Sequence, residues 1–172
     1  MQGATLPKLS LLVAVRDEEP NLRAFHTKAI DALKALPCSS EIIYIENGSS
    51  DSSPEILRSF TDAIVIELQV ERTLKKPEKT AALKAGIDHS TGEIIAMIDA
   101  DLQNDPADLL PLFNKLQEGF DAVIGWRKNR KDSIARCVVS RIGRLFRRLS
   151  GCNAIHDSAC GMKMFRRECI AV

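Results

Sequence analysis

The chain has 172 residues, a length that fits one domain with a substantial core. Its apolar share of 45% and charged share of 27% are ordinary for a globular protein, and its formal net charge of +1 argues against a nucleic-acid binder. The five cysteines are odd in number and lack C-x-x-C spacing. We therefore expect no zinc site or disulfide framework, mostly buried thiols and a cytoplasmic setting.

Apolar runs and helical stripes alternate along the chain. Residues 9–15 form an apolar run typical of a buried strand, and residues 20–36 carry apolar side chains at helical spacing until Pro37. This alternation predicts an α/β fold with a central, mostly parallel sheet flanked by helices. Further strands are expected at 41–45, 63–68, 94–99, 121–126 and just before Arg167; further helices are expected around 56–60 (capped by Ser50 or Asp51), at 79–89 and at 106–119.

The segment from Ile94 to Gln103 contains a strand-like run that ends in two carboxylates, Asp99 and Asp101, separated by Ala100. Ligands of α/β proteins collect outside the carboxyl ends of the strands. A carboxylate pair in that place suits a hard cation, Mg²⁺ or Mn²⁺, held beside a phosphate. The alternative is a strand end whose aspartate merely caps the next helix.

Polar residues also end other predicted strands, at Arg16-Asp17-Glu18, Glu46-Asn47-Gly48 and Arg127. If these strands are parallel neighbours, the clusters lie along one rim, where carboxylates can hold a base and ribose while Lys79 and Arg127 neutralise a diphosphate. The chain lacks G-x-G-x-x-G and G-x-x-x-x-G-K-[ST], which disfavours a dinucleotide oxidoreductase and a P-loop enzyme. An aspartyl phosphatase stays only a minor alternative. In that class the carboxylate pair follows the first strand of the core, whereas here it follows roughly the fourth. The rim favours a nucleotide-sugar substrate.

Positive charge is concentrated late in the chain. Nine of the 24 Lys and Arg residues fall between Arg127 and Arg148, with one acid, Asp132. Residues 132–149 are expected to form a basic amphipathic helix, which suits an anionic membrane surface. A solvated face of a packed surface helix is the alternative. No run of 18 apolar residues occurs, so no transmembrane segment is expected within these residues.

Four motifs in order then reveal a resemblance. They are residues 13–22 (VAVRDEEPNL), 46–51 (ENGSSD), 79–86 (KTAALKAG) and 99–106 (DADLQNDP). With this order and spacing, the chain resembles the family 2 inverting glycosyltransferases, and most of all the branch that loads a sugar onto a polyprenyl (dolichyl or undecaprenyl) phosphate. The likeness runs from about Leu9 to Arg167, and residues 1–172 are expected to be one catalytic domain.

The resemblance implies a GT-A (Rossmann-like) fold and a nucleotide-sugar donor linked to UDP or GDP. It implies that Asp99, Asp101 and Gln103 hold Mg²⁺ or Mn²⁺. Residues 157–163 match the acceptor-side motif, in which Asp157 is the candidate base or orienting carboxylate. Asp157, Asp101 and Arg127 are the catalytic candidates; the residues expected around the donor and its phosphates are Val15, Asp17, Glu18, Glu46, Asn47, Lys79, Asp99, Ala100, Arg127, Arg130 and Lys163.

The expected function is therefore metal-dependent, inverting sugar transfer to a polyprenyl phosphate, with the domain peripheral on the cytoplasmic membrane face. Two alternatives remain: a soluble family 2 enzyme acting on a glycan or protein, and a non-catalytic domain that binds a sugar nucleotide. The end of the sequence predicts continuation into membrane helices and possible self-association through that region. Arg16 stands where the family has an aromatic residue, so the base and sugar are not fixed by the motifs.

Three expected site residues have simpler readings. Glu18 can merely favour a helix N-terminus, as Asp51 can, because acids there complement the helix dipole. Gln103 can be a plain loop residue, and Lys79 a solvated helix charge.

Overall fold

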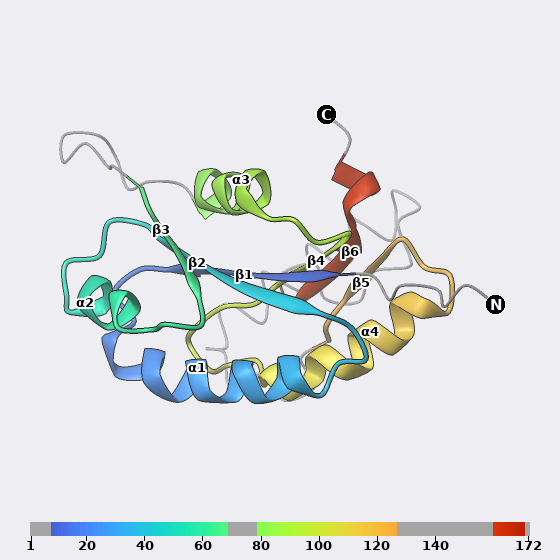
Figure 1. The fold of residues 1–172 in the computed structure, drawn as a ribbon, viewed down its shortest axis with the longest axis horizontal. Helices are drawn as coiled ribbons and strands as arrows, with labels where there is room; N and C mark the ends of the chain where they lie inside the picture. The colour runs from blue at the N-terminus through green and yellow to red at the C-terminus, as the bar shows by residue number, and fades with distance from the viewer. Residues whose placement is uncertain (1–7, 69–78, 127–159, 171–172) are drawn as a thin grey trace, which may run out of the picture.

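The computed structural model describes residues 8–68, 79–126 and 160–170. Within them, a six-stranded sheet has the order β3-β2-β1-β4-β6-β5 (Figure 1). Four strands are parallel neighbours: β1 (Leu9–Val15), β2 (Ser40–Glu46), β3 (Ile64–Glu67) and β4 (Ile94–Met97). The mostly parallel α/β sheet expected from the sequence is confirmed.

Helices cover both faces of this sheet. On one face lie α1 (Glu19–Lys34), α2 (Ser53–Arg58) and α4 (Leu109–Gln117), and on the other face lies α3 (Lys79–His89) (Figure 1). The two-residue period of the strands feeds both layers. Leu11, Val13 and Val15 of β1 pack towards α1, whereas Leu12 packs with Ala82 of α3.

Helix α3 packs on the sheet through a glycine. A Cβ atom on its Gly86 would lie 2.8 Å from Ile45 Cδ1 and 3.4 Å from Leu12 Cδ2. Glycine therefore sets the distance between this helix and strands β1 and β2. This close packing fixes the separation of α3 from the sheet but not its position along the strands.

The sheet differs from expectation at one edge. Strand β6 (Lys163–Arg166) is antiparallel and lies between β4 and β5 (Ala122–Ile124), so β5 is not a direct neighbour of β4. Because β6 is antiparallel, its first residue, Lys163, lies at the edge where β4 and β5 end, paired with Met97 and Ile124. The sequence marked both strands but carried no signal for their pairing.

The helix expected from Pro106 begins differently. Residues Pro106–Asp108 form a 3₁₀ turn, η1, and α4 starts only at Leu109. Pro111 lacks the N–H that would bond to the Ala107 carbonyl if an α-helix started at Pro106. Asp105 caps this turn, its carboxylate accepting a 3.2 Å hydrogen bond from the Ala107 N–H.

Two other expectations concern segments and thiols. The basic helix expected at 132–149 lies outside the described residues. Among the helices that are described, none combines the length and apolarity needed to cross a membrane. Most of the five thiols were expected to be buried; of the three that the structure describes, Cys160 is buried, Cys38 is half-buried and Cys169 is exposed.

Candidate active site

The carboxyl ends of β1, β2 and β4 meet at one edge of the sheet, and we call this edge the site rim. Val15 pairs with Glu46, and the Asn47 N–H donates a 3.0 Å hydrogen bond to the Val15 carbonyl. Strand β4 lies on the other side of β1. The rim thus brings the motifs that follow Val15, Ile45 and Met97 side by side, as parallel neighbours require.

The first two loops of the rim are tied together at Asp17. Its backbone has φ of 53°, a left-handed conformation that few residues other than Gly, Asn and Asp adopt. Its Oδ1 atom accepts hydrogen bonds from the Ser50 N–H at 2.7 Å and the Ser50 hydroxyl at 3.0 Å. These bonds lower the pKa of Asp17 below its ordinary value. One oxygen of this expected donor-binding residue therefore has a structural task.

A second set of bonds joins the starts of α1 and α2. Asp51 accepts from the Glu19 N–H at 3.0 Å and from the Ser53 N–H at 2.9 Å. Burial raises the pKa of Asp51, but bonds from Ser53 and Glu19 lower it by more, so it lies below its ordinary value. Helix α2 begins at Ser53, and Ser52 holds the cap position without a side-chain bond, one residue after Asp51 and two after Ser50, the expected caps.

Glu18 and Glu46 occupy different environments at the rim. Glu18 stands at the cap position of α1 and its Oε2 accepts a 2.8 Å bond from the Asn21 amide. The simpler reading of Glu18, as a residue at a helix start, therefore has a counterpart in the structure. Glu46 is only 6% exposed, and its Oε1 accepts a bond from the Ser49 N–H. Neighbouring Asn47 is also buried.

Asp99 and Lys79 form an ion pair at the rim. Ile98 and Ala100 pack into the layer under α1 and α4, so the alternation of the chain places Asp99 on the face of α3. Lys79 is the first residue of α3, and its ammonium contacts Asp99 Oδ1. The Lys79 side chain is 55% exposed and that of Asp99 30%, so solvent and small ions reach the pair.

The turn after Asp99 is closed by Asp101. Its Oδ1 accepts a 3.0 Å bond from the Gln103 N–H, while Leu102 between them has φ of 57°. This bond orients the Asp101 carboxylate. Asp101 is partly exposed, and Gln103 is exposed.

The rim offers oxygen ligands from Asp99, Asp101 and Gln103, the kind that hard divalent cations prefer. In the described part of the chain, no three His, Cys, Asp or Glu side chains gather as a metal site. Mg²⁺ is commonly held by one or two carboxylates together with substrate phosphates and water. Two carboxylates and an amide therefore fit an ion that is completed by a diphosphate.

A segment that is distant in sequence, residues 160–163, packs against Asp99. A Cβ atom on Gly161 would lie only 2.2 Å from Asp99 Oδ2, so no other residue fits there without moving the carboxylate. The preceding Cys160 is buried, and its thiol donates a 3.4 Å bond to Asn104 Oδ1. Neither Gly161 nor Asn104 was named as a site residue from the sequence. The glycine inside the acceptor-side motif was the one available signal.

The remaining candidates lie partly outside the described residues. Arg127, Arg130 and Asp157 fall in the segment that is not described, so their placement stays a prediction. Lys163 begins β6 at the rim, and Trp126, which follows β5, is 60% exposed. The structure thus brings together Val15, Asp17, Glu18, Glu46, Asn47, Lys79, Asp99, Ala100, Asp101 and Gln103, with Lys163 two strands from β1.

The geometry agrees with comparisons to known proteins. The profile described as glycosyl transferase family 2 matches residues 10–171. The chain belongs to glycosyl transferase family 2. Its sequence resemblance to this family is confirmed, and the matched range includes every motif of the rim.

Curated relatives of this family 2 chain use lipid acceptors by name. An undecaprenyl-phosphate 4-deoxy-4-formamido-L-arabinose transferase of Salmonella choleraesuis is 34% identical over 98% of this chain and 51% of its own length. A dodecaprenyl-phosphate galacturonate synthase of Rhizobium johnstonii is 32% identical over 95% of this chain and 49% of its own. The chain therefore spans about half the length of the curated relatives it matches.

Solved structures support the GT-A fold expected for the family 2 chain. Glucosyl-3-phosphoglycerate synthase of Mycobacterium tuberculosis, crystallised with Mn²⁺, UDP-glucose and phosphoglyceric acid, matches with a TM-score of 0.70 at 21% identity, over 94% of this chain and 57% of that one. A mannosyltransferase of Pyrobaculum calidifontis, with GDP-mannose and Mn²⁺, has a TM-score of 0.62 at 20% identity, over 94% and 45%. These matches confirm the fold class.

Proposed function

We propose that this domain transfers a sugar, with inversion, from a nucleoside diphosphate to the phosphate of a polyprenyl lipid. The observation that carries the proposal is the Asp99–Lys79 pair at the site rim, with Asp101 one residue beyond. Oxygen ligands and a cation at the carboxyl end of a parallel sheet suit a diphosphate. The family assignment and the lipid-phosphate relatives support the same reaction.

In this proposal the donor lies across the first two loops of the rim. Buried Glu46 and the Glu18 carboxylate face the nucleoside, and Val15, Asp17, Asn47 and Ala100 lie beside it. The bonds from Asp17 to Ser50 and from Asp51 to Glu19 hold these loops in place before the donor arrives. Preorganised loops reduce the entropy lost on binding. The base is either uracil or guanine.

Asp99, Asp101 and Gln103 would hold Mg²⁺ or Mn²⁺. When bound, the ion neutralises charge on the departing diphosphate. The neighbours crystallised with Mn²⁺ support a divalent ion of this kind. Lys79 contacts Asp99, and a donor diphosphate would draw the ammonium towards its own oxygens, helped by Arg127, Arg130 and Lys163.

The proposed reaction needs little general-base catalysis. A lipid phosphate oxygen, already anionic near neutral pH, forms the new bond to the anomeric carbon. The bond from that carbon to the diphosphate breaks, and the nucleoside diphosphate leaves with the electron pair. Rate enhancement then comes from positioning and from charge stabilisation of the leaving group. Asp157 would orient the acceptor phosphate.

The proposed location is the cytoplasmic face of a membrane, where residues 132–149 would meet anionic headgroups. The high density of arginine and lysine between Arg127 and Arg148 supports this placement. Flotation with liposomes containing or lacking anionic lipid tests it. Equal indifference to both kinds of liposome would contradict a membrane role.

The deciding experiment is a thermal-shift panel of UDP and GDP, each with and without Mn²⁺. We expect stabilisation only when nucleotide and metal are present together, because each completes the other's site. The larger shift identifies the base. Release of nucleoside diphosphate from UDP- or GDP-sugars on addition of polyprenyl phosphate then tests transfer. No shift with either pair would overturn the donor proposal, and binding without release would favour a non-catalytic domain.

A further inference from the structure

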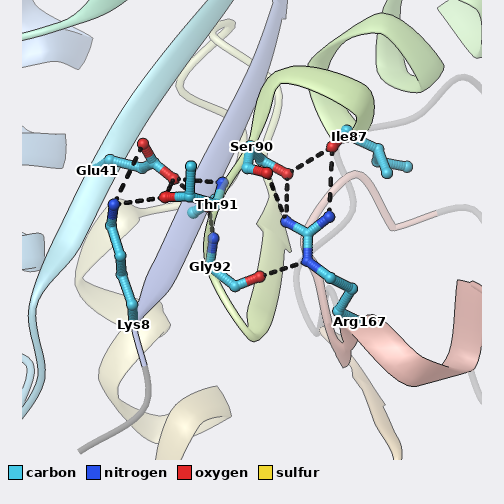
Figure 2. A network of polar contacts seen from close by, with 8 residues as sticks. Lys8, Glu41, Ile87, Ser90, Thr91, Gly92 and Arg167 are labelled. Atoms are coloured by element: carbon cyan, nitrogen blue, oxygen red, sulfur yellow. Dashed lines mark hydrogen bonds and ion pairs between the residues drawn. The ribbon is translucent and has the colours of Figure 1, made fainter.

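The other end of α3 is held by an arginine that follows strand β6. The Arg167 side chain donates hydrogen bonds to the carbonyls of Gly92 at 2.6 Å, Ser90 at 3.0 Å and Ile87 at 3.4 Å, and to the Ser90 hydroxyl at 2.6 Å (Figure 2). Its own N–H bonds to the Glu93 carbonyl at 2.8 Å. One guanidinium therefore gathers the last turn of α3 and the loop that leads into β4.

These carbonyls need a cationic partner. The last carbonyls of a helix have no partner within it and carry the negative end of its dipole. A guanidinium offers five donors in a planar fork and keeps its charge at every relevant pH. Arg167 is half-buried, so solvent screens these bonds less than those of a surface pair. It is therefore a strong anchor for the end of α3.

The anchored unit has both of its far ends in the site rim. Helix α3 begins at Lys79 and runs to His89, where the loop held by Arg167 follows. Strand β4 then returns from that loop towards Asp99. Lys79 and Asp99, which contact each other, are thus the two ends of one helix–loop–strand unit.

Sliding of α3 along the sheet would change how the two ends meet. The helix is about 15 Å long at 1.5 Å per residue, and a helix transmits a small shift along its axis. Gly86 fixes the distance of α3 from β1 and β2 but, having no side chain, does not lock its position along them. The bonds of Arg167 hold the last turn of α3 directly, at Ile87 and Ser90, whereas Glu41 and Ser10 hold only the loop beyond it, at Thr91 and Gly92.

We propose that Arg167 is a positioning residue that places Lys79 for the donor diphosphate by fixing the far end of α3. It touches neither donor nor metal in this proposal. Its functional consequence rests on the proposed function, whereas the mechanical coupling along α3 does not.

A double-mutant cycle tests the proposal. Wild type, Arg167→Ala, Lys79→Ala and the double variant are titrated with UDP and with GDP in the presence of Mn²⁺ by calorimetry. We expect Arg167→Ala to weaken binding about 5- to 20-fold in the wild-type background, and less than about twofold in the Lys79→Ala background. Equal losses in both backgrounds would overturn the proposal. Arg167→Lys is expected to restore part of the affinity, since it keeps the charge but not the fork.

Arg166→Ala is the matched control. Arg166 precedes Arg167, is also half-buried, and donates a 3.4 Å bond to the Leu116 carbonyl at the end of α4, a helix that gives no side chain to the rim. Its removal is expected to change nucleotide affinity less than about twofold. If Arg166→Ala weakened binding as much as Arg167→Ala, general loosening would explain the effect and the proposal would fail.

Hydrogen exchange separates this proposal from the proposed function. In an α-helix the amides of Leu83 and Lys84 bond to the carbonyls of residues 79 and 80. Arg167→Ala is expected to speed their exchange as well as that of the last turn, without any ligand. Faster exchange confined to Asp88 and His89 would overturn the coupling. If Arg167→Ala speeds exchange at Leu83 and Lys84 but the wild type binds neither UDP nor GDP, the coupling is upheld and the donor site is refuted.

Discussion

The two ends of the same sheet both carry carboxylates at strand termini, yet they use them differently. At the site rim, Asp99 contacts an exposed lysine, Lys79. At the opposite end, Glu41 near the start of β2 accepts bonds from the Ser10 hydroxyl at 2.7 Å and from the Thr91 N–H and hydroxyl, both at 2.8 Å. Figure 2 shows Glu41 beside Lys8 and Thr91.

The difference lies in the partners. Backbone and hydroxyl donors held by the fold cannot leave Glu41, whose side chain is only 14% exposed. A flexible lysine can leave Asp99 when a ligand arrives, because an exposed ion pair is worth little in water. Glu41 joins β1 and the loop before β4 to β2, whereas the Asp99 carboxylate stays available to a ligand. The identity of the donor, more than the carboxylate itself, tells a structural acid from a candidate ligand.

The largest expected effect separates the two acids by activity. We expect Asp99→Asn to lower sugar transfer at least about 100-fold, since it weakens metal binding at the leaving diphosphate. Its melting temperature should change by less than about 3 °C, because the lost partner is an exposed lysine. Initial rates with saturating donor and Mn²⁺ measure this. The control is Asp88→Asn, which removes an exposed ion pair with Lys84 on α3 and should leave the rate unchanged.

A glycine substitution sharpens the same contrast without removing a charge. Gly161→Ala places a Cβ atom 2.2 Å from Asp99 Oδ2, so the carboxylate must move. Moving a catalytic group by about 1 Å can cost about 10- to 100-fold in rate. Kinetics at several Mn²⁺ concentrations check it.

Gly119→Ala is the counterpart of that variant. Gly119 has φ of +102° and open space around it, so alanine strains only the backbone, by about 1–2 kcal/mol. We expect it to lower stability and leave the rate per folded molecule unchanged. If Gly161→Ala also changed stability alone, the contact with Asp99 would have no functional weight.

At the opposite end of the sheet, the expected effect is on stability. Glu41→Ala leaves the Ser10 hydroxyl and the Thr91 N–H without their acceptor, which should cost about 2 kcal/mol of unfolding free energy. Urea unfolding at pH 7 measures it. Turnover per folded molecule should stay within about twofold, since Arg167 still holds the last turn of α3 at Ile87 and Ser90 when Glu41 is removed. Glu55→Ala, an exposed acid of α2, serves as the control.

The smallest expected effect is a pH dependence. Burial raises the pKa of Glu41, but bonds from Ser10 and Thr91 and the charge of Lys8 lower it by more, so it lies below its ordinary value of 4.5. A lowered folded pKa gives stability that is complete above about pH 4.5 and lost as the pH falls through the folded value. The stability difference between wild type and Glu41→Gln should therefore shrink below pH 4.5. A difference independent of pH from 7 to 3 would contradict this.

Much of this architecture follows from local patterns. The apolar run at 9–15, the helical stripe ended by Pro37 and the helix at 79–89 were all predictable, because burial against a sheet dictates their periods. The rim followed from one inference, that parallel neighbours place their carboxyl ends together. Asp99 and Lys79 were both named as candidates on this basis, although their functional roles stay predictions.

What local pattern missed depends on contacts between distant segments. Nothing near residues 163–166 tells which strands they join, so the insertion of β6 beside β4 was not foreseen. The closeness of Gly161 to Asp99 follows from that insertion. Arg167 was passed over for the same reason, since a lone arginine after a strand gives no sign of the carbonyls it will meet. The segment with Arg127 and Asp157 stays a prediction.

One residue at the rim makes the protein its own optical probe. Trp126 is the single tryptophan in the sequence, and it stands exposed where β5 ends. Indole fluorescence from this chain therefore arises at one place, near the rim, against a background of one tyrosine. A shift of its emission maximum, or a change in its quenching by iodide, would report ligand binding near the rim without any attached dye.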